Sequence, residues 1–94
     1  MKLRVQYAAQ LRAVVGRHEE DVDLPDGSSL ADLLTHLASR YDRGAESHLL
    51  TDLGHVRPSL LLVLNDTAVS SSQAACTVLR SGDQVALLPP IGGG

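Results

Sequence analysis

The residues most suggestive of a function form the last segment of the sequence, Ile91-Gly92-Gly93-Gly94. Glycine has no side chain to bury and loses more conformational entropy on ordering than any other residue, so this segment adds nothing to stability. Four residues reach ~13 Å when extended, and glycines would pass through a channel that admits little more than a backbone. Pro89 and Pro90 fix φ at two positions and direct the segment away from the domain. The segment is therefore either a frayed terminus or a functional thread.

Histidine and cysteine are the other side chains that could hold a metal or act as nucleophiles. No two histidines have the i,i+4 or zinc-finger spacing, which favours surface or capping roles over a metal site. The single cysteine excludes an internal disulfide framework, and its place beside an expected strand favours a small buried apolar role over a nucleophile. We therefore expect no metal site from His18, His36, His48, His55 and Cys76.

An acidic run, Glu19-Glu20-Asp21-Val22-Asp23, is the one candidate for paired catalytic carboxylates. Its alternation with Val22 and Leu24 favours a strand whose acidic side chains face solvent. The sequence has no glycine-rich dinucleotide loop, no phosphate-binding loop and no nucleophile elbow. The chain therefore shows no catalytic machinery of its own.

The length of 94 residues allows one small domain, and an apolar content of 44% argues against a disordered chain. The net charge of −3 argues against nucleic acid as a partner. No apolar run approaches the ~18 residues that span a bilayer, and the first residues lack the apolar stretch of a signal peptide. We expect a cytoplasmic protein without a membrane partner. Its core must consist of Leu, Val and Ala, because the chain has no Phe and no Trp.

Periodicity predicts two strands, a main helix and then two or three further strands. The apolar stripe from Leu30 to about Tyr41 has helical spacing, and Ser28 or Ser29 can cap its start. A short helical turn ending at Gly16 separates the first two strands. One further helical turn is expected near residues 47–50. The expected strands cover residues 2–7, 20–24, 60–64, 67–69 and 84–88, of which 60–64 reads as a buried strand.

This order of elements predicts an α+β domain over residues 1–90, followed by a flexible tail over residues 91–94. The first two strands can pair as a hairpin, and the last strand can return beside the first. The result would be a mixed sheet of four to five strands packed on one main helix. Val85 and Leu87 would face the core, so that Leu88 would face outward.

Three segments of the chain carry a resemblance to a known family: Gln6 to Arg12, Asn65 to Ser70 and, above all, Ser81 to Gly94. With the order of elements, they resemble the small subunit of molybdopterin synthase, within the ubiquitin-like sulfur-carrier family. The resemblance covers nearly the whole chain and is weakest across residues 45–59. The chain departs from the family at Leu87-Leu88 and at Tyr7-Ala8, where aromatic residues are usual.

The resemblance implies a ubiquitin-like β-grasp fold and a role in sulfur transfer without catalysis by the chain itself. In similar proteins a ubiquitin-activating-like adenylyltransferase uses ATP to adenylate the carboxyl group, here that of Gly94. A sulfur-donating persulfide enzyme then supplies the sulfur of a thiocarboxylate. The large subunit of molybdopterin synthase uses this sulfur for the molybdopterin dithiolene. Ile91, Gly92 and Gly93 would be the thread inserted into the partner, and no cofactor would be bound permanently.

The resemblance also places a docking surface on the domain. Leu88, Ala68 and Ala8 match positions that contribute to an apolar docking patch in the family, and Arg12 matches a position near the partner surfaces. Because two of the three patch positions are alanine, the patch would be smaller than is usual. The alternatives to a docking role are that Leu88 is an ordinary exposed leucine at a strand end and that Arg12 is a solvated arginine.

Three other functions remain open at this point. A sulfur carrier of the same class could serve thiamine thiazole or amino-acid biosynthesis. A ubiquitin-like modifier would be conjugated to lysines through Gly94. A β-grasp interaction module would have an inert tail.

Overall fold

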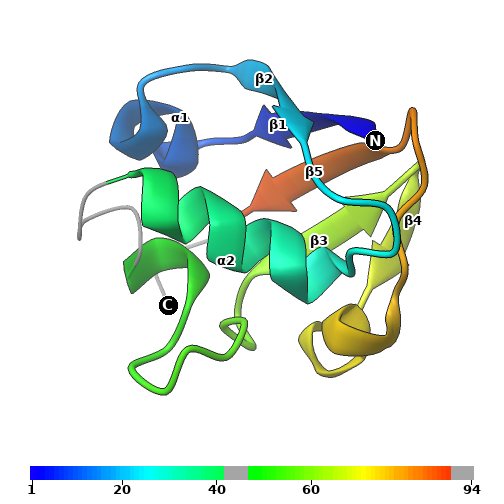
Figure 1. Ribbon diagram of the computed structural model, residues 1–94. Coiled ribbons are helices and arrows are strands. Elements are labelled where there is room, and N and C mark those ends of the chain that lie inside the picture. The colour runs from blue at the N-terminus through cyan, green and yellow to red at the C-terminus, as the bar shows by residue number, and fades with distance from the viewer. Residues whose placement is uncertain (42–46, 90–94) are drawn as a thin grey trace.

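The fold is a five-stranded mixed sheet with the strand order β2-β1-β5-β3-β4, seen in a computed structural model that describes residues 1–41 and 47–89 (Figure 1). β5 runs parallel to β1 and antiparallel to β3, while β1–β2 and β3–β4 are antiparallel pairs. The predicted α+β class, the first hairpin and the return of the last strand beside the first are confirmed. The strands are β1 (Lys2–Tyr7), β2 (Glu19–Asp23), β3 (Leu61–Leu64), β4 (Thr67–Val69) and β5 (Gln84–Leu88).

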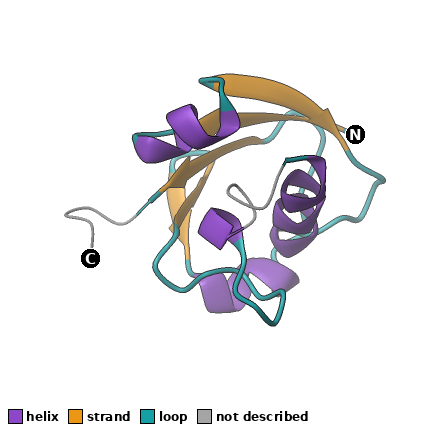
Figure 2. Ribbon diagram, turned by 90° about the vertical axis from the view of Figure 1, so that its left-hand side faces the viewer, coloured by secondary structure: helices purple, strands orange, loops and turns teal. Residues whose placement is uncertain are grey.

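The main helix is α2 (Leu30–Arg40), which crosses one face of the sheet (Figures 1 and 2). Of the two candidate caps, Ser29 is the one used. Its hydroxyl accepts a hydrogen bond from the Asp32 backbone N–H at 3.1 Å, and the Asp32 carboxylate accepts one from the Ser29 N–H at 2.9 Å. This capping box satisfies two of the backbone donors that a helix start leaves free.

In the part of the chain that the structure describes, three shorter helical segments connect the strands. α1 (Gln10–Val15) joins β1 to β2 and ends at Gly16, whose φ of 88° is the left-handed conformation that glycine adopts without strain. Residues 47–49 are helical, close to the predicted turn at 47–50. The serine-rich connection after β4 is a 3-10 helix, η1 (Ser71–Cys76).

The core lies between α2 and the inner face of the sheet and consists of aliphatic residues and one tyrosine. Leu33, Leu34 and Leu37 from α2 meet the inward side chains of the strands. These inward side chains follow the period-two alternation predicted from the sequence, including Val85 and Leu87 on β5. The inward strand residues are Leu3, Val5, Tyr7, Val22, Leu62, Val85 and Leu87.

Three of the burial predictions are wrong, and two of them concern Cys76 and the run from Leu60 to Leu64. Cys76 is exposed, because it is the last residue of η1 and that helix buries Ala74 instead. The run from Leu60 to Leu64 is not a strand buried on both faces, since Leu61 is 47% exposed. β3 buries Leu62 under α2 and turns Leu61 to the other face of the sheet, which no described helix covers.

Candidate functional site: an apolar docking face

The end of β1 brings Ala8 beside the end of β5. Tyr7 pairs with Leu87, and the ladder continues when the Ala8 N–H donates to the Leu87 carbonyl at 3.1 Å. The chain then turns sharply at Ala9, whose φ of 52° is rare for a residue with a Cβ atom, and α1 begins. Ala8 and Leu88 are thereby held on the same side of the sheet at the point where β5 ends.

The registers of β3, β4 and β5 place apolar side chains in rows across the outer face of the sheet. Leu61 is paired with Leu88, and Val63 is paired with Ala86 on one side and Ala68 on the other. Because directly opposed residues point to the same face, these side chains form one continuous surface. We define the docking patch as Ala8, Leu61, Val63, Ala68, Ala86 and Leu88.

The docking patch unites the positions suggested by the family resemblance and adds others. Leu88 and Ala8 lie next to each other, whereas Ala68 lies on the outermost strand and reaches them through Val63. Leu61 contributes the largest exposed apolar side chain. Sequence reasoning missed Leu61, although its alternation with Leu62 was the signal that could have found it.

A charged margin borders the patch on β1 and β2. Arg4 lies between two acidic side chains of β2, with its Nε 3.1 Å from Asp21 and its Nη1 3.2 Å from Glu19. All three side chains are about half exposed, so these ion pairs add little to stability. The outer face therefore has an apolar half on β3, β4 and β5 and a charged half on β1 and β2.

Arg12 lies on α1 beside the apolar half of this face. Its Nε donates to the Tyr7 carbonyl at 2.9 Å, which fixes the exposed guanidinium over a hollow of about 270 Å³. Ala8, Leu88 and His18 also line this hollow. A guanidinium held in this way can bind a carboxylate through two parallel hydrogen bonds. The structure thus brings Arg12 together with Ala8 and Leu88.

Glu20 is the polar side chain that sequence reasoning misplaced. It was expected on the solvated face of β2, but it is only 8% exposed. Glu20 alternates in step with Val22, so the strand directs both toward the core. Its carboxylate accepts hydrogen bonds from the hydroxyls of Tyr7, at 2.6 Å, and Tyr41.

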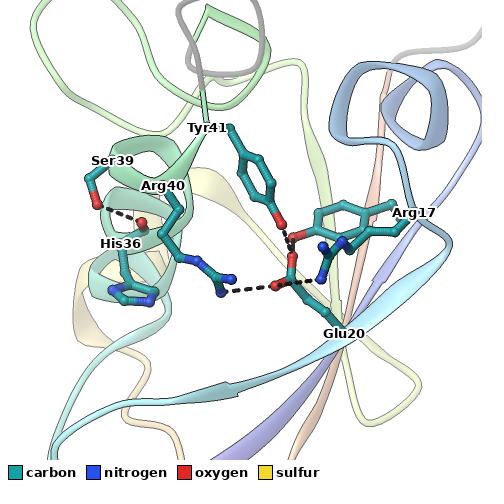
Figure 3. Close-up of polar contacts among 7 residues, drawn as sticks. Arg17, Glu20, His36, Ser39, Arg40 and Tyr41 are labelled. Carbon is teal, nitrogen blue, oxygen red and sulfur yellow. Dashed lines mark hydrogen bonds and ion pairs between the residues drawn. The ribbon is translucent and has the colours of Figure 1, made fainter.

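Two arginines complete the surroundings of Glu20 (Figure 3). The Nη1 of Arg40 lies 2.9 Å from the Glu20 Oε1, and that of Arg17 lies 3.7 Å from it. Burial alone raises the pKa of Glu20, but the hydrogen bonds from Tyr41 and Tyr7 and the charges of Arg40 and Arg17 outweigh it, so its pKa lies below the usual value.

The tyrosine hydroxyls respond in the opposite direction. Burial raises the pKa of Tyr7, and the hydrogen bond to Glu20 raises it further; the same causes raise the pKa of Tyr41. Both hydroxyls therefore remain donors at neutral pH. Because the carboxylate is fully occupied by these partners, Glu20 acts by joining β2 to β1 and to the end of α2, not as a free acid or base.

The tail residues that sequence reasoning singled out, Ile91, Gly92, Gly93 and Gly94, lie outside the described residues. β5 ends at Leu88, which is a residue of the docking patch. Within residues 1–41 and 47–89, no three His, Cys, Asp or Glu side chains are grouped closely enough to hold a metal ion. In the same ranges, no helix has the length and apolar character needed to cross a membrane.

A model of the ThiS family matches residues 5–94 of the chain. The chain belongs to the ThiS family. Sulfur carriers of the ThiS family are small proteins that are not themselves catalysts. The match extends over the docking patch, Glu20 and the glycine-rich end of the sequence.

Individual relatives match the chain from end to end. Small archaeal modifier protein 3 of Haloferax volcanii is 32% identical, and the molybdopterin synthase sulfur carrier subunit of Chlamydomonas reinhardtii is 30% identical, each over 100% of both chains. The crystal structure of SAMP1 from Haloferax volcanii superposes with a TM-score of 0.86 at 26% identity over 100% of both chains. The ubiquitin-like β-grasp fold is confirmed, and the family is one of sulfur carriers and ubiquitin-like modifiers.

Proposed function

We propose that this protein is the sulfur carrier subunit of a molybdopterin synthase. The carboxyl group of Gly94 is adenylated, converted to a thiocarboxylate and used as the sulfur donor for the molybdopterin dithiolene. The observation that carries the proposal is the uncovered apolar patch at the end of β5, directly before the glycine-rich segment. The relative from Chlamydomonas, named as such a subunit, supports it.

The chemistry at Gly94 requires activation from outside the chain. A carboxylate with a reference pKa of ~3.5 is ionised at neutral pH and is a poor electrophile. A ubiquitin-activating-like adenylyltransferase transfers AMP from ATP to this carboxylate and releases pyrophosphate. The sulfur of an enzyme-bound persulfide then attacks the acyl carbon, AMP leaves, and reductive cleavage of the S–S bond by a thiol releases the thiocarboxylate. The chain supplies no acid or base and binds no permanent cofactor, and the need for ATP agrees with a cytoplasmic location.

The docking patch and the tail have separate tasks in this proposal. The large subunit covers Leu88, Leu61 and Ala68, and a carboxylate of the partner pairs with Arg12. Ile91, Gly92 and Gly93 then extend into the partner's site, where a chain without Cβ atoms needs the least room. The alanines of the patch leave space that the partner's side chains fill.

Intact-mass analysis of the protein isolated from its own cells tests the proposal most directly. We expect a fraction of the chain to be heavier by the difference between sulfur and oxygen, with the change mapped to Gly94. Protein from cells that lack the adenylyltransferase provides the control and should show no such fraction. A chain that never carries the added sulfur in cells making molybdopterin would contradict the proposal.

Reconstitution with the large subunit tests the role of the tail. Deleting Gly94 should abolish sulfur transfer and leave the thermal midpoint unchanged, because the deletion removes no buried side chain. Gly93→Val should slow adenylation or transfer far more than Ile91→Val, since it adds a β-branched side chain to the thread. Normal transfer by Gly93→Val would show that the partner's channel is not narrow.

A protein modifier is the second candidate function. The relative from Haloferax, which is named a modifier protein, favours it. Proteomic detection of Gly94 linked to lysines of other proteins would support the modifier, whereas thiocarboxylate without conjugates would support the carrier. A neighbouring gene for a large synthase subunit would distinguish molybdopterin from thiazole or amino-acid pathways.

A further inference from the structure

The chain is unusually poor in amines. Among 94 residues it has a single lysine, Lys2, beside seven arginines. Arginine is protonated throughout the physiological pH range and does not act as an acyl acceptor. A protein whose own carboxyl group is activated would therefore meet very few nucleophilic nitrogens on its copies.

The Met1 nitrogen is already engaged. It donates a hydrogen bond to the Leu24 carbonyl at 2.8 Å and lies 3.5 Å from the Asp26 carboxylate. The Leu24 N–H in turn donates to the Met1 carbonyl at 3.0 Å, so Met1 is held at both backbone groups. An amine fixed in this way must break its hydrogen bond before it can attack an acyl carbon.

Lys2 is placed differently. It is exposed at the start of β1, and its side chain borders a hollow of about 350 Å³ that Arg4, Asp21 and Gln84 also line. Within residues 1–41 and 47–89, the Lys2 ammonium makes no ion pair or side-chain hydrogen bond. Six residues of extended strand, about 20 Å, separate Lys2 from Ala8 in the docking patch.

We propose that Lys2 is the acceptor site at which one copy of this chain is acylated by the activated carboxyl group of another. The proposal rests on the activation of Gly94 put forward above. The neutral Nζ attacks the acyl carbon of the Gly94 adenylate, an amide bond forms, the bond from the acyl carbon to the phosphate oxygen breaks, and AMP leaves with the electron pair. The amine proton passes to solvent.

This assignment restricts the products. Because each copy offers one lysine and one activated carboxyl group, linked copies form an unbranched series with a single type of linkage.

A chemically prepared thioester tests the assignment. The full chain carrying a thioester at Gly94 is mixed with excess unmodified chain, and linked pairs are mapped by peptide mass spectrometry. We expect an amide between Gly94 and Lys2 that resists hydroxylamine. Lys2→Arg keeps the charge and should reduce this product by about 100-fold or more, because a guanidinium loses its proton far less readily than an ammonium.

Two controls make each outcome decisive. Nα-acetyl-lysine added to the mixture shows that the thioester is reactive, and Cys76→Ser removes the exposed thiol as a competing acceptor. Three outcomes would each overturn the assignment. Lys2→Arg could still form pairs, linked through the Met1 nitrogen, or hydroxylamine could cleave the pairs. The third outcome is that no pairs form although Nα-acetyl-lysine reacts with the thioester. Since the thioester needs no ATP, a missing thiocarboxylate in cells would reject the proposed function and leave the Lys2 result standing.

Discussion

Replacing Glu20 by glutamine is expected to destabilise the domain strongly. The substitution keeps the volume of the side chain but turns one acceptor oxygen into a donor that faces either the tyrosine hydroxyls or the Arg40 guanidinium. Hydrogen bonds to a charged group contribute about 1.5–3 kcal/mol each, and an unsatisfied buried group costs about 1–3 kcal/mol. We therefore expect the free energy of unfolding to fall by about 2–3 kcal/mol.

The matched control is the neighbouring glutamate. Glu19→Gln removes an ion pair to Arg4 in which both side chains are about half exposed, and it should cost only about 0.2–1 kcal/mol. For a domain of this size about 1 kcal/mol corresponds to roughly 4–8 °C in the thermal midpoint. Thermal unfolding at pH 7 should thus separate the two variants by roughly 4–22 °C, with Glu20→Gln the less stable.

A double-mutant cycle identifies the contact responsible. Combining Glu20→Gln with Tyr41→Phe should give a coupling energy of about 0.5 kcal/mol or more, because the two side chains share a hydrogen bond. The account of a buried carboxylate that joins β2 to the end of α2 would be refuted by either of two results. One is that Glu19→Gln and Glu20→Gln lower the free energy of unfolding by the same small amount. The other is that the effects of Glu20→Gln and Tyr41→Phe are additive.

The remaining predictions concern pH, docking and backbone strain. Because folding lowers the pKa of Glu20, the stability that this carboxylate contributes is complete above its unfolded pKa of about 4.5 and is lost as the pH falls through the folded pKa. In acid titrations, the difference in unfolding free energy between wild type and Glu20→Gln should therefore disappear as the pH falls through the folded pKa. Leu88→Glu should weaken binding of the large subunit by about 100-fold or more in calorimetry and leave the free domain folded. Val78→Glu changes an exposed side chain beside the start of α2 and should leave this binding unchanged. Ala9→Gly should raise the free energy of unfolding by about 1 kcal/mol by relieving its positive φ, while Ala13→Gly within α1 should lower it by about 0.5–1 kcal/mol. Unchanged binding by Leu88→Glu, or a loss of stability in Ala9→Gly, would contradict these two accounts.

Local patterns were sufficient to predict most of the fold. The alternation from Lys2 to Tyr7, the capping of α2 and the turn before β5 each depend on residues close together in the sequence. The outward direction of Leu88 followed from the same alternation on β5. Its nearness to Ala8 came from the family resemblance, because parallel pairing joins residues about eighty positions apart.

What local patterns could not supply was the identity of distant partners. The burial of Glu20 depends on Tyr41 and Arg40, which only the packing of α2 brings near β2. An acidic residue in an acidic run is usually solvated, so composition pointed the wrong way. The exposure of Leu61 likewise depends on which face of the sheet α2 covers, and an apolar run alone does not reveal this.

The position of β5 bears on how the protein is synthesised. β5 comes after the other four described strands in the sequence, yet it lies at the centre of the sheet between β1 and β3. Until residues 84–88 leave the ribosome, β1–β2 and β3–β4 are two separate hairpins without the strand that joins them. Contacts between such distant segments make folding slow relative to local structure. We therefore expect nascent chains to remain protease-sensitive until β5 emerges. The docking surface then forms only in copies whose synthesis has reached the glycine-rich segment that follows β5.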